Sequence, residues 1–271
     1  PKRKSMNSNR MLILPIAGRS SRYAGMRPKW SLTMPDGDLM VEKCVKGLNP
    51  EDFDRILLLG LKEHGRLVSP DFLIDSISKI TNRSTDFAEI SSSTSQVDTI
   101  MQGLSSTGHD GPVFIKDSDN FFACRWSGKN EIAVVDLHTQ GRIDAASKSF
   151  VELGTGNRVI NIVEKRVISD FFCCGGYGFE SAEMFKKAAE QLDSVEELYV
   201  SHVIFKLLME GACFNPVAAK DYMDWGTAAD FFEYKQNYQT LFVDFDGVLV
   251  ENSSKFAQPP WGLVPIEGNL R

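Results

Sequence analysis

The amino-acid sequence predicts an α/β protein in which helices flank a mixed, mainly parallel sheet. One observation predicts this class, and a second sets the size of the core. Short apolar runs alternate with segments of helical periodicity along most of the chain, which is the order expected of repeated β-α-β units. The chain has 271 residues, 42% of them hydrophobic and 24% charged, so it can bury one large core with or without an appendage.

The apolar runs give the expected strands. The first covers residues 11–16 (MLILPI) and is apolar throughout, as in a strand buried on both faces of a sheet. The run at 112–120 (PVFIKDSDN) passes from a buried strand into an acidic turn. Further strands are expected at 55–60, near 86–90, and at 131–137, 158–165, 173–179 and 241–245.

Helices are expected between these strands. Residues 95–104 (SQVDTIMQGL) carry apolar side chains at the three- and four-residue spacing of an amphipathic helix, with Ser95 as the N-cap. Residues 223–227 (MDWGT) are typical of a turn. The other expected helices cover 39–48, 64–79, 181–193, 196–210 and 227–238.

Charge and cysteine content exclude several classes of protein. A formal net charge of −6 argues against a general nucleic-acid or membrane-surface role. No apolar run approaches the roughly 18 residues of a membrane span, and no signal-peptide pattern opens the chain. The five cysteines form no CxxC pair, and the adjacent Cys173 and Cys174 would point to opposite faces of a strand. We therefore expect a cytoplasmic protein with reduced thiols and no zinc site.

Basic residues gather in the loop after the first strand. Residues 14–30 (LPIAGRSSRYAGMRPKW) contain Arg19, Arg22, Arg27 and Lys29. A strand that runs into a glycine-containing turn leaves backbone N–H groups free to face an anion, and arginine binds phosphate bidentately. The loop has neither the GK[ST] of a P-loop nor a GxGxxG pattern, so a solvated basic loop is the alternative interpretation.

Three aspartates predict a metal site. Asp117 and Asp119 follow a buried strand, at the end where α/β sheets place their ligands, and Asp224 lies in the distant MDWGT turn. Carboxylates that converge beside a phosphate site suit Mg²⁺, which takes its remaining ligands from phosphate oxygens and water. The alternative for each aspartate is turn formation or helix capping, above all for Asp224, which directly precedes an expected helix.

Five blocks in order carry a resemblance to a known family. The blocks LPIAGRSSR…PK, SQVDTIMQGL, KDSDN, IVEK and MDWGTAADFFEYK, spread over residues 11–238, resemble the nucleotidyltransferases that make nucleotide-activated sugars. The resemblance implies a Rossmann-like, GT-A-type fold and an Mg²⁺-dependent reaction of an NTP with a small phosphorylated acceptor that releases pyrophosphate. Such a reaction needs alignment and charge neutralisation and no protein nucleophile.

The resemblance also implies roles for individual residues. Arg22 would hold the departing pyrophosphate, Lys29 the α-phosphate, and Glu164 and Lys165 the acceptor, so that Arg22, Lys29 and Lys165 form the expected catalytic set. Asp119 and Asp224 would bind Mg²⁺, and the segment from Thr94 to Thr99 would border the base. The expected nucleotide-binding residues are Ala17, Gly18, Arg19, Ser20, Ser21, Arg22, Lys29, Thr94, Ser95, Gln96, Thr99 and Asp117.

Two departures from the family pattern bear on specificity. Ser20 replaces the second glycine of the family's AGxGxR signature, and Ser95 stands where many members have glycine. The base therefore stays open, with CTP, UTP or dTTP favoured. Three alternatives also stay open: a cytidylyltransferase for a non-sugar phosphate such as a phospho-amino acid or phosphocholine, a GT-A glycosyltransferase, and a non-catalytic ligand-binding domain. Members of the family often self-associate, so a homo-oligomer is compatible with the resemblance.

The end of the chain follows another pattern. Residues 241–252 (LFVDFDGVLVEN) resemble the first motif of the haloacid-dehalogenase (HAD) phosphatases, which implies Asp244 as nucleophile and Asp246 as general acid/base. The later motifs of that superfamily have no room before Arg271, so we expect 239–271 to be the start of a HAD-like domain that is not active here. Residues 1–5 are interpreted as a vector-derived remnant and 6–238 as the nucleotidyltransferase domain. The fusion suggests, by analogy, a pathway enzyme of capsule or cell-surface polysaccharide synthesis.

Overall fold

The computed structural model describes residues 9–141, 143–192 and 197–238, together with 248, 250 and 265–269. The chain divides into two compact units, Pro1–Phe232 and Glu233–Arg271, and the first contains all the strands and helices discussed below, except the end of α6. Within the described part of the chain, no helix combines the length and the apolar character needed to cross a membrane. The strand predicted at 241–245, with Asp244 and Asp246, lies outside the described residues.

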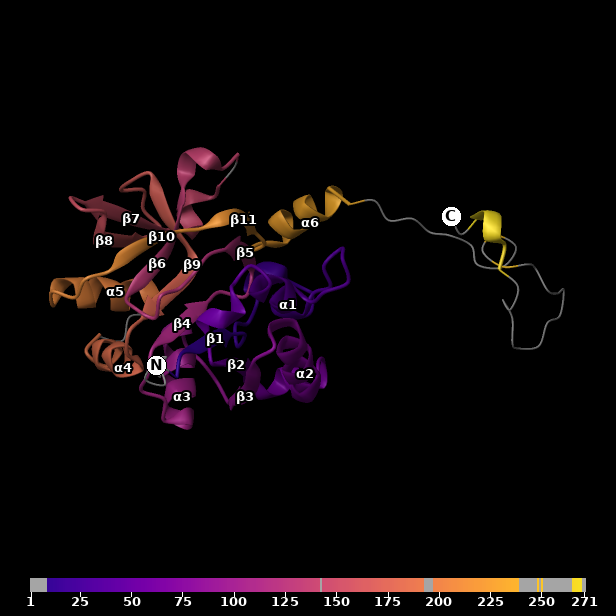
Figure 1. Cartoon of the computed structure of the whole chain (residues 1–271), viewed down its shortest axis with the longest axis horizontal. Helices are drawn as coiled ribbons and strands as arrows, with labels where there is room; N and C mark the ends of the chain where they lie inside the picture. The colour runs from indigo at the N-terminus through magenta and orange to yellow at the C-terminus, as the bar shows by residue number, and fades with distance from the viewer. Residues whose placement is uncertain are drawn as a thin grey trace, which may run out of the picture. The chain divides into compact units, whose positions relative to one another are not determined.

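A mixed sheet forms the centre of the first unit, with the strand order β10-β6-β9-β4-β1-β2-β3 (Figure 1). A β7-β8 hairpin extends it through β9, and β5 and β11 form a separate antiparallel pair. The strands are β1 (Met11–Pro15), β2 (Arg55–Leu61), β3 (Ser84–Ile90), β4 (Val113–Lys116), β5 (Asn120–Ala123), β6 (Glu131–Asp136), β7 (Ser149–Gly154), β8 (Arg158–Glu164), β9 (Phe171–Phe179), β10 (Asn215–Ala218) and β11 (Lys220–Asp224).

Strand direction divides the sheet. The strands β4, β1, β2 and β3 run parallel to one another, and β10 runs parallel to β6. β9 is antiparallel to both β4 and β6 and joins the two groups. The carboxyl ends of β1 and β4 therefore open on the same edge of the sheet, which is where such folds bind ligands. The predicted α/β class with a mixed, mainly parallel sheet flanked by helices is confirmed.

Helices cover both faces of the sheet. Alternate residues of β1 face opposite sides of the sheet and therefore pack in different cores. Ile13 belongs to a core that includes α3, α4 and α5, whereas Leu12 belongs to a core that includes α1 and α2. The adjacent Cys173 and Cys174 divide between the same two cores as predicted, and the five cysteines are free thiols. The helices are α1 (Met40–Val45), α2 (Pro70–Thr81), α3 (Gln96–Thr107), α4 (Ala182–Glu190), α5 (Val200–Met209) and α6 (Ala228–Gln236).

Several predicted boundaries differ from the structure, for local reasons. The expected helix at 39–48 ends at Val45, because the chain then passes so close to β5 that a Cβ on Gly47 would lie 2.0 Å from the carbonyl oxygen of Phe122. The expected helix at 64–79 begins only at Pro70, which is favoured at a first helical position, after a 3₁₀ turn. The strands β5, β7, β10 and β11 were not predicted, and β11 replaces the first part of the expected turn at 223–227.

Candidate functional site

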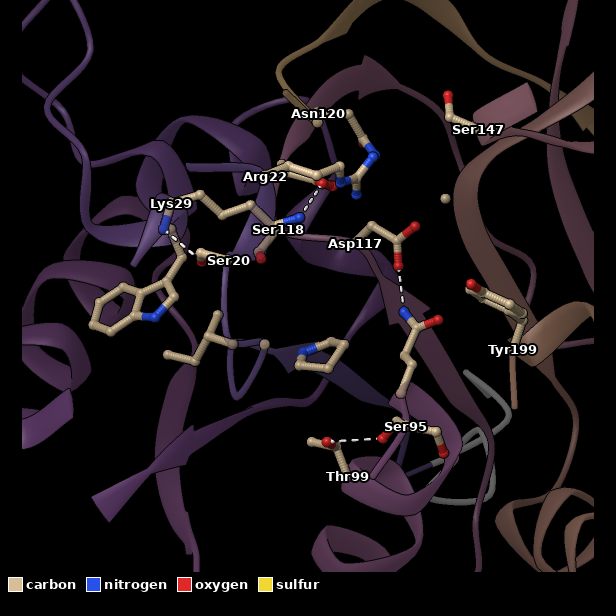
Figure 2. A pocket seen from close by; sticks show the side chains of 18 of the residues that line it. Ser20, Arg22, Lys29, Ser95, Thr99, Asp117, Ser118, Asn120, Ser147 and Tyr199 are labelled. Atoms are coloured by element: carbon tan, nitrogen blue, oxygen red, sulfur yellow. Dashed lines mark hydrogen bonds and ion pairs between the residues drawn. The ribbon is translucent and has the colours of Figure 1, made fainter. Parts of the chain in front are cut away.

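A cavity of about 690 Å³ lies at the carboxyl ends of β1 and β4. Its wall is formed by segments that are far apart in the sequence, chiefly 15–22, 93–96, 117–120, 147–149 and 173–175. Figure 2 shows Ser20 and Lys29 on one side of the cavity and Ser147 and Tyr199 on the other. This volume is within the range of small-molecule sites in proteins.

The basic loop after β1 forms one wall. Gly18 has no atom within 4 Å of the place where a Cβ would lie, so its backbone faces open space. Ser20 has a φ of 53°, a left-handed conformation that glycine adopts more easily, and its hydroxyl accepts a hydrogen bond from the Lys29 N–H at 2.9 Å. This bond gives Ser20 a local stabilisation that the glycine of the family signature would lack.

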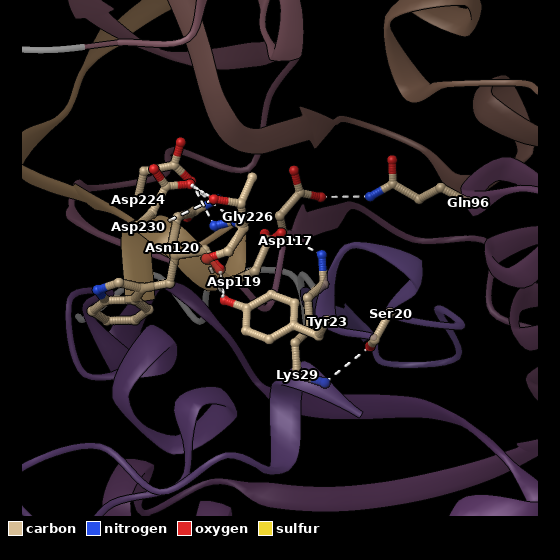
Figure 3. A network of polar contacts seen from close by, with 12 residues as sticks. Ser20, Tyr23, Lys29, Gln96, Asp117, Asp119, Asn120, Asp224, Gly226 and Asp230 are labelled. Carbon is tan, nitrogen blue, oxygen red and sulfur yellow. Dashed lines mark hydrogen bonds and ion pairs between the residues drawn. The ribbon is translucent and has the colours of Figure 1, made fainter. Parts of the chain in front are cut away.

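Tyr23 ties the basic loop to the segment that follows β11. Its hydroxyl contacts the carbonyl oxygens of Trp225 and Thr227, the latter at 2.9 Å, and its ring is buried (Figure 3). Burial and the nearby charge of Asp119 raise the pKa of Tyr23, so the hydroxyl stays protonated and acts as a donor. No sequence motif marks Tyr23 for this role.

The acidic turn after β4 places two carboxylates in the cavity. Asp117 accepts a hydrogen bond from Gln96, and burial followed by the charge of Asp119 raises its pKa to about 6. Asp119 pairs with Lys29. Burial disfavours the charged form of Asp119, but Lys29, Lys148 and Arg22 outweigh it and hold the pKa of this carboxyl below its usual range.

A buried lysine organises the same turn. Lys116 is fully buried, and its ammonium donates to the carbonyl oxygens of Asp117 (2.7 Å) and Asn120 (3.0 Å) and to the Asn120 side chain. It also lies 4.3 Å from the centroid of the Phe122 ring. These contacts fix the backbone on both sides of Asp119. A lysine at the end of an otherwise apolar strand was the only sequence signal for this role.

Asp224 reaches the cavity from β11. It lies opposite Asn120 in the β5–β11 pair, and the Trp225 N–H donates to the carbonyl oxygen of Asp119 at 2.8 Å. One oxygen of the Asp224 carboxylate accepts from the Gly226 N–H at 3.0 Å, and the other pairs with Lys148. Asp224 thus forms a local turn, as its alternative interpretation expected, but it also faces the cavity.

Capping of α6 does not involve Asp224. The hydroxyl of Thr227 accepts from the Asp230 N–H at 3.2 Å, and the Asp230 carboxylate accepts from the Thr227 N–H at 3.0 Å. These two reciprocal hydrogen bonds supply acceptors for backbone N–H groups at the start of α6. The carboxylate of Asp224 is therefore not needed for capping.

The two predicted metal ligands converge. A Cβ on Gly226 would lie 3.1 Å from an oxygen of Asp224 and 3.6 Å from an oxygen of Asp119, with Arg22 Nη1 at 3.7 Å (Figure 3). The described residues contain no cluster of three or more His, Cys, Asp or Glu side chains that could hold a metal. Two carboxylates beside an arginine fit Mg²⁺, which accepts few protein ligands and completes its shell with phosphate and water.

Most of the predicted site residues line this one cavity. They come from six segments and include Ala17, Gly18, Arg19, Ser20, Ser21, Arg22, Lys29, Thr94, Ser95, Gln96, Thr99, Asp117, Asp119, Glu164 and Asp224. Trp30 also lines the cavity and is almost fully buried. Ser95 caps α3 by accepting from the Asp98 N–H at 3.1 Å, which confirms that prediction.

Of the two residues expected at the acceptor, Glu164 lines the cavity and Lys165 does not. Glu164 lines the cavity and accepts hydrogen bonds from the hydroxyls of Ser149 and Ser201. Lys165 is not part of the cavity wall described above; its ammonium bonds to the Tyr199 hydroxyl and lies 3.7 Å from Glu197. Its predicted role at the acceptor stays a prediction.

Solved structures of similar fold were found, although no family model and no curated protein matches the chain. The nucleoside-diphosphate-sugar pyrophosphorylase from Vibrio cholerae RC9 aligns with a TM-score of 0.67 and 22% identity over 83% of this chain and 100% of its own. The inositol-1-phosphate CTP transferase from T. maritima aligns with a TM-score of 0.66 and 16% identity over 86% and 99%. A UDP-glucose pyrophosphorylase complexed with UDP-glucose aligns with 0.66 and 12% over 84% and 98%. These likenesses show that the chain has the fold of these proteins.

Proposed function

We propose that the protein is a nucleotidyltransferase that joins an NTP to a phosphorylated sugar or a similar small phosphorylated acceptor and releases pyrophosphate. The observation that carries this proposal is the convergence of Asp119 and Asp224 with Arg22 and Lys29 of the basic loop in one cavity. Adjacent cationic and anionic groups of this kind suit a metal-bound polyphosphate, because the phosphates meet the basic groups and the metal meets the carboxylates.

The chain's own residues supply alignment and charge. The backbone of Ala17 and Gly18 approaches the phosphates, Lys29 binds the α-phosphate, and Arg22 binds the β- and γ-phosphates as they leave. An oxygen of the acceptor phosphate attacks the α-phosphorus, and the bond from this phosphorus to the bridging oxygen breaks, so that its electron pair leaves with pyrophosphate. No covalent enzyme intermediate is formed.

Asp119 and Asp224 would hold Mg²⁺. When bound, the ion would neutralise charge on the phosphate oxygens. In the structure each carboxylate is paired with a lysine, Asp119 with Lys29 and Asp224 with Lys148. These pairs hold both carboxylates at the cavity, where they can bind a divalent cation once the phosphates of the substrate pair with the two lysines.

The segment from Thr94 to Thr99 would border the base. The hydroxyl of Ser93 bonds to Thr99 at 2.6 Å and Thr94 bonds to Asp98, so these contacts hold the segment in place at the start of α3. Two of the similar structures are named for CTP or for a UDP-sugar, in agreement with the pyrimidine nucleotide, CTP, UTP or dTTP, that we favour.

A cytidylyltransferase for a non-sugar phosphate is the nearest alternative, since the same phosphate loop would serve it, and the T. maritima protein is named as a CTP transferase for inositol 1-phosphate. A GT-A glycosyltransferase would need the metal site without the basic loop. A role in capsule or cell-surface polysaccharide synthesis in the cytoplasm, and a HAD-like domain in cis, are parts of the same proposal and rest on analogy.

The proposal is tested by pyrophosphate release. The protein is incubated with Mg²⁺ and each NTP against a panel of sugar 1-phosphates and other phosphorylated metabolites, beside Asp119→Ala and Lys29→Ala. We expect release that requires one NTP and one acceptor and falls at least about a hundredfold in either variant, since each removes a charged group at the reacting phosphates. Release that persists unchanged in both variants would refute the assigned site.

A further inference from the structure

Lys148, which belongs to no recognised motif, lines the cavity next to Ser147, on the side opposite Ser20 and Lys29 (Figure 2). Lys148 lies between a 3₁₀ turn (Ala145–Ser147) and β7, and it lines the cavity with only 11% of its side chain exposed. Its ammonium pairs with Asp224 and lies 5.6 Å from the centroid of the Tyr222 ring. These contacts hold the side chain of Lys148 with its ammonium at the cavity.

The arrangement repeats that of Lys29. Lys29 has 19% of its side chain exposed and pairs with Asp119, 90 residues away, whereas Lys148 pairs with Asp224, 76 residues away. The cavity therefore has an ammonium group beside each of its two converging carboxylates, and two separate cations can offset the repulsion between two phosphates that react with each other.

Lys165 does not occupy an equivalent position. It has 47% of its side chain exposed and has a φ of 57°. Its ammonium bonds to the Tyr199 hydroxyl, lies 4.4 Å from the centroid of that ring and lies 3.7 Å from Glu197. Tyr199 and Glu197 line the cavity and Lys165 does not, so these contacts hold its ammonium away from Asp119 and Asp224.

We infer that Lys148, and not Lys165, binds the phosphate group of the acceptor; this inference rests on the proposed function. A phosphomonoester dianion that enters from the side of Ser147 and Tyr199 meets the Lys148 ammonium and replaces Asp224 as its partner, which leaves Asp224 free for the cation. The organic part of the acceptor then lies toward Glu164 and Tyr199. The lysine transfers no proton in this step; it stabilises the attacking oxygen in position and offsets the repulsion between the two phosphates.

The test measures binding and does not require turnover. Non-hydrolysable α,β-methylene analogues of the NTPs are titrated into the protein with Mg²⁺ by calorimetry, and inorganic phosphate is then titrated into the nucleotide-saturated protein as a probe of the acceptor subsite. We expect Lys148→Met to weaken phosphate binding at least about tenfold, as the loss of one charge-assisted hydrogen bond would, while nucleotide affinity changes less than about threefold.

Two further variants serve as controls. Lys148→Arg keeps the charge and is expected to bind phosphate within about threefold of the wild type, and Lys165→Met is expected to change neither affinity by more than about threefold. Loss of phosphate binding in Lys165→Met but not in Lys148→Met would overturn the inference, as would a nucleotide-loaded wild type that binds no phosphate. Failure of every nucleotide to bind the wild type would instead refute the proposed function, and this inference with it.

Discussion

Gly18 lies in the loop that follows β1 and lines the cavity. A substitution at this position can distinguish an effect on folding from an effect on nucleotide binding. Because no atom lies within 4 Å of its would-be Cβ, Gly18→Ala is expected to change the free energy of unfolding by less than about 0.5 kcal/mol. The added methyl group would meet the phosphates, so nucleotide binding is expected to weaken at least about tenfold. Urea unfolding and nucleotide titration measure the two effects.

The matched control for this change is Gly141→Ala, since Gly141 is equally unhindered but does not line the cavity. It is expected to leave both stability and nucleotide binding unchanged. Equal nucleotide binding by Gly18→Ala and the wild type would show that the phosphates do not approach the loop backbone.

Lys116 stabilises the acidic turn at 117–120 through hydrogen bonds from its buried ammonium. Lys116→Met would leave the carbonyl oxygens of Asp117 and Asn120, and the Asn120 side chain, without their donor, and we expect a loss of about 3 kcal/mol in the free energy of unfolding. Lys79→Met removes an exposed i,i+4 pair with Asp75 and is expected to cost less than about 0.5 kcal/mol. Urea unfolding of both variants is the measurement. Equal free energies of unfolding for Lys116→Met and Lys79→Met would contradict the stabilisation of the turn by Lys116.

His64 makes stability depend on pH. Burial lowers its pKa from 6.5, and its Nδ1 lies 3.4 Å from the Trp30 indole N–H, which requires an unprotonated nitrogen. Between the lowered pKa and 6.5 the unfolded chain binds the proton and the folded chain does not, so this contribution is complete above pH 6.5 and is lost as the pH falls through that window. His64→Phe should therefore lose less stability than the wild type between about pH 7 and 5. Identical slopes in urea unfolding would contradict this.

At the level of elements, the chain that follows α1 packs closely against β5 at Gly47. A Cβ on Gly47 would lie 2.0 Å from the carbonyl oxygen of Phe122, a backbone atom that cannot move without shifting β5. Gly47→Ala is therefore expected to cost about 1–3 kcal/mol and to weaken nucleotide binding, because β5 continues directly from the acidic turn. Gly65→Ala, whose Cβ would come no closer than 3.7 Å to Pro70, is the control for thermal unfolding and binding. A variant at position 47 as stable as this control would contradict the packing described.

Local pattern predicted the elements that carry a strong periodicity of their own. The continuous apolar runs of β1, β2 and β4 and the spacing and cap of α3 could be recognised directly. β5 and β11 could not, because each is short and only partly buried, and their pairing joins segments about 100 residues apart. Such pairing depends on tertiary contacts, which a local window does not contain.

The same distinction applies to the site. Residues in recognisable blocks, such as Arg22, Lys29 and Asp119, could be named in advance, and the structure brings them together. Lys148 and Tyr23 belong to no pattern, since their importance comes from what the fold places beside them: Asp224 for the first and the carbonyl oxygens after β11 for the second. Neither neighbour is close in sequence.

On the scale of the whole molecule, the cavity depends on the topology of the sheet. The basic loop follows β1, the acidic turn follows β4 on the adjacent strand, and β11 returns to pair with β5 beside them. We propose that this assembled cavity transfers a nucleotidyl group, rather than a terminal phosphoryl or a glycosyl group.

Isotopic labelling of the NTP distinguishes these three kinds of transfer. With Mg²⁺ and an acceptor from the panel, NTP labelled at the α-phosphate and NTP labelled at the γ-phosphate are reacted in parallel, and the products are separated. We expect the α-label to appear in the acceptor product and the γ-label in pyrophosphate. A γ-label transferred to the acceptor, or released as orthophosphate while the α-label stays in NDP, would contradict this proposal.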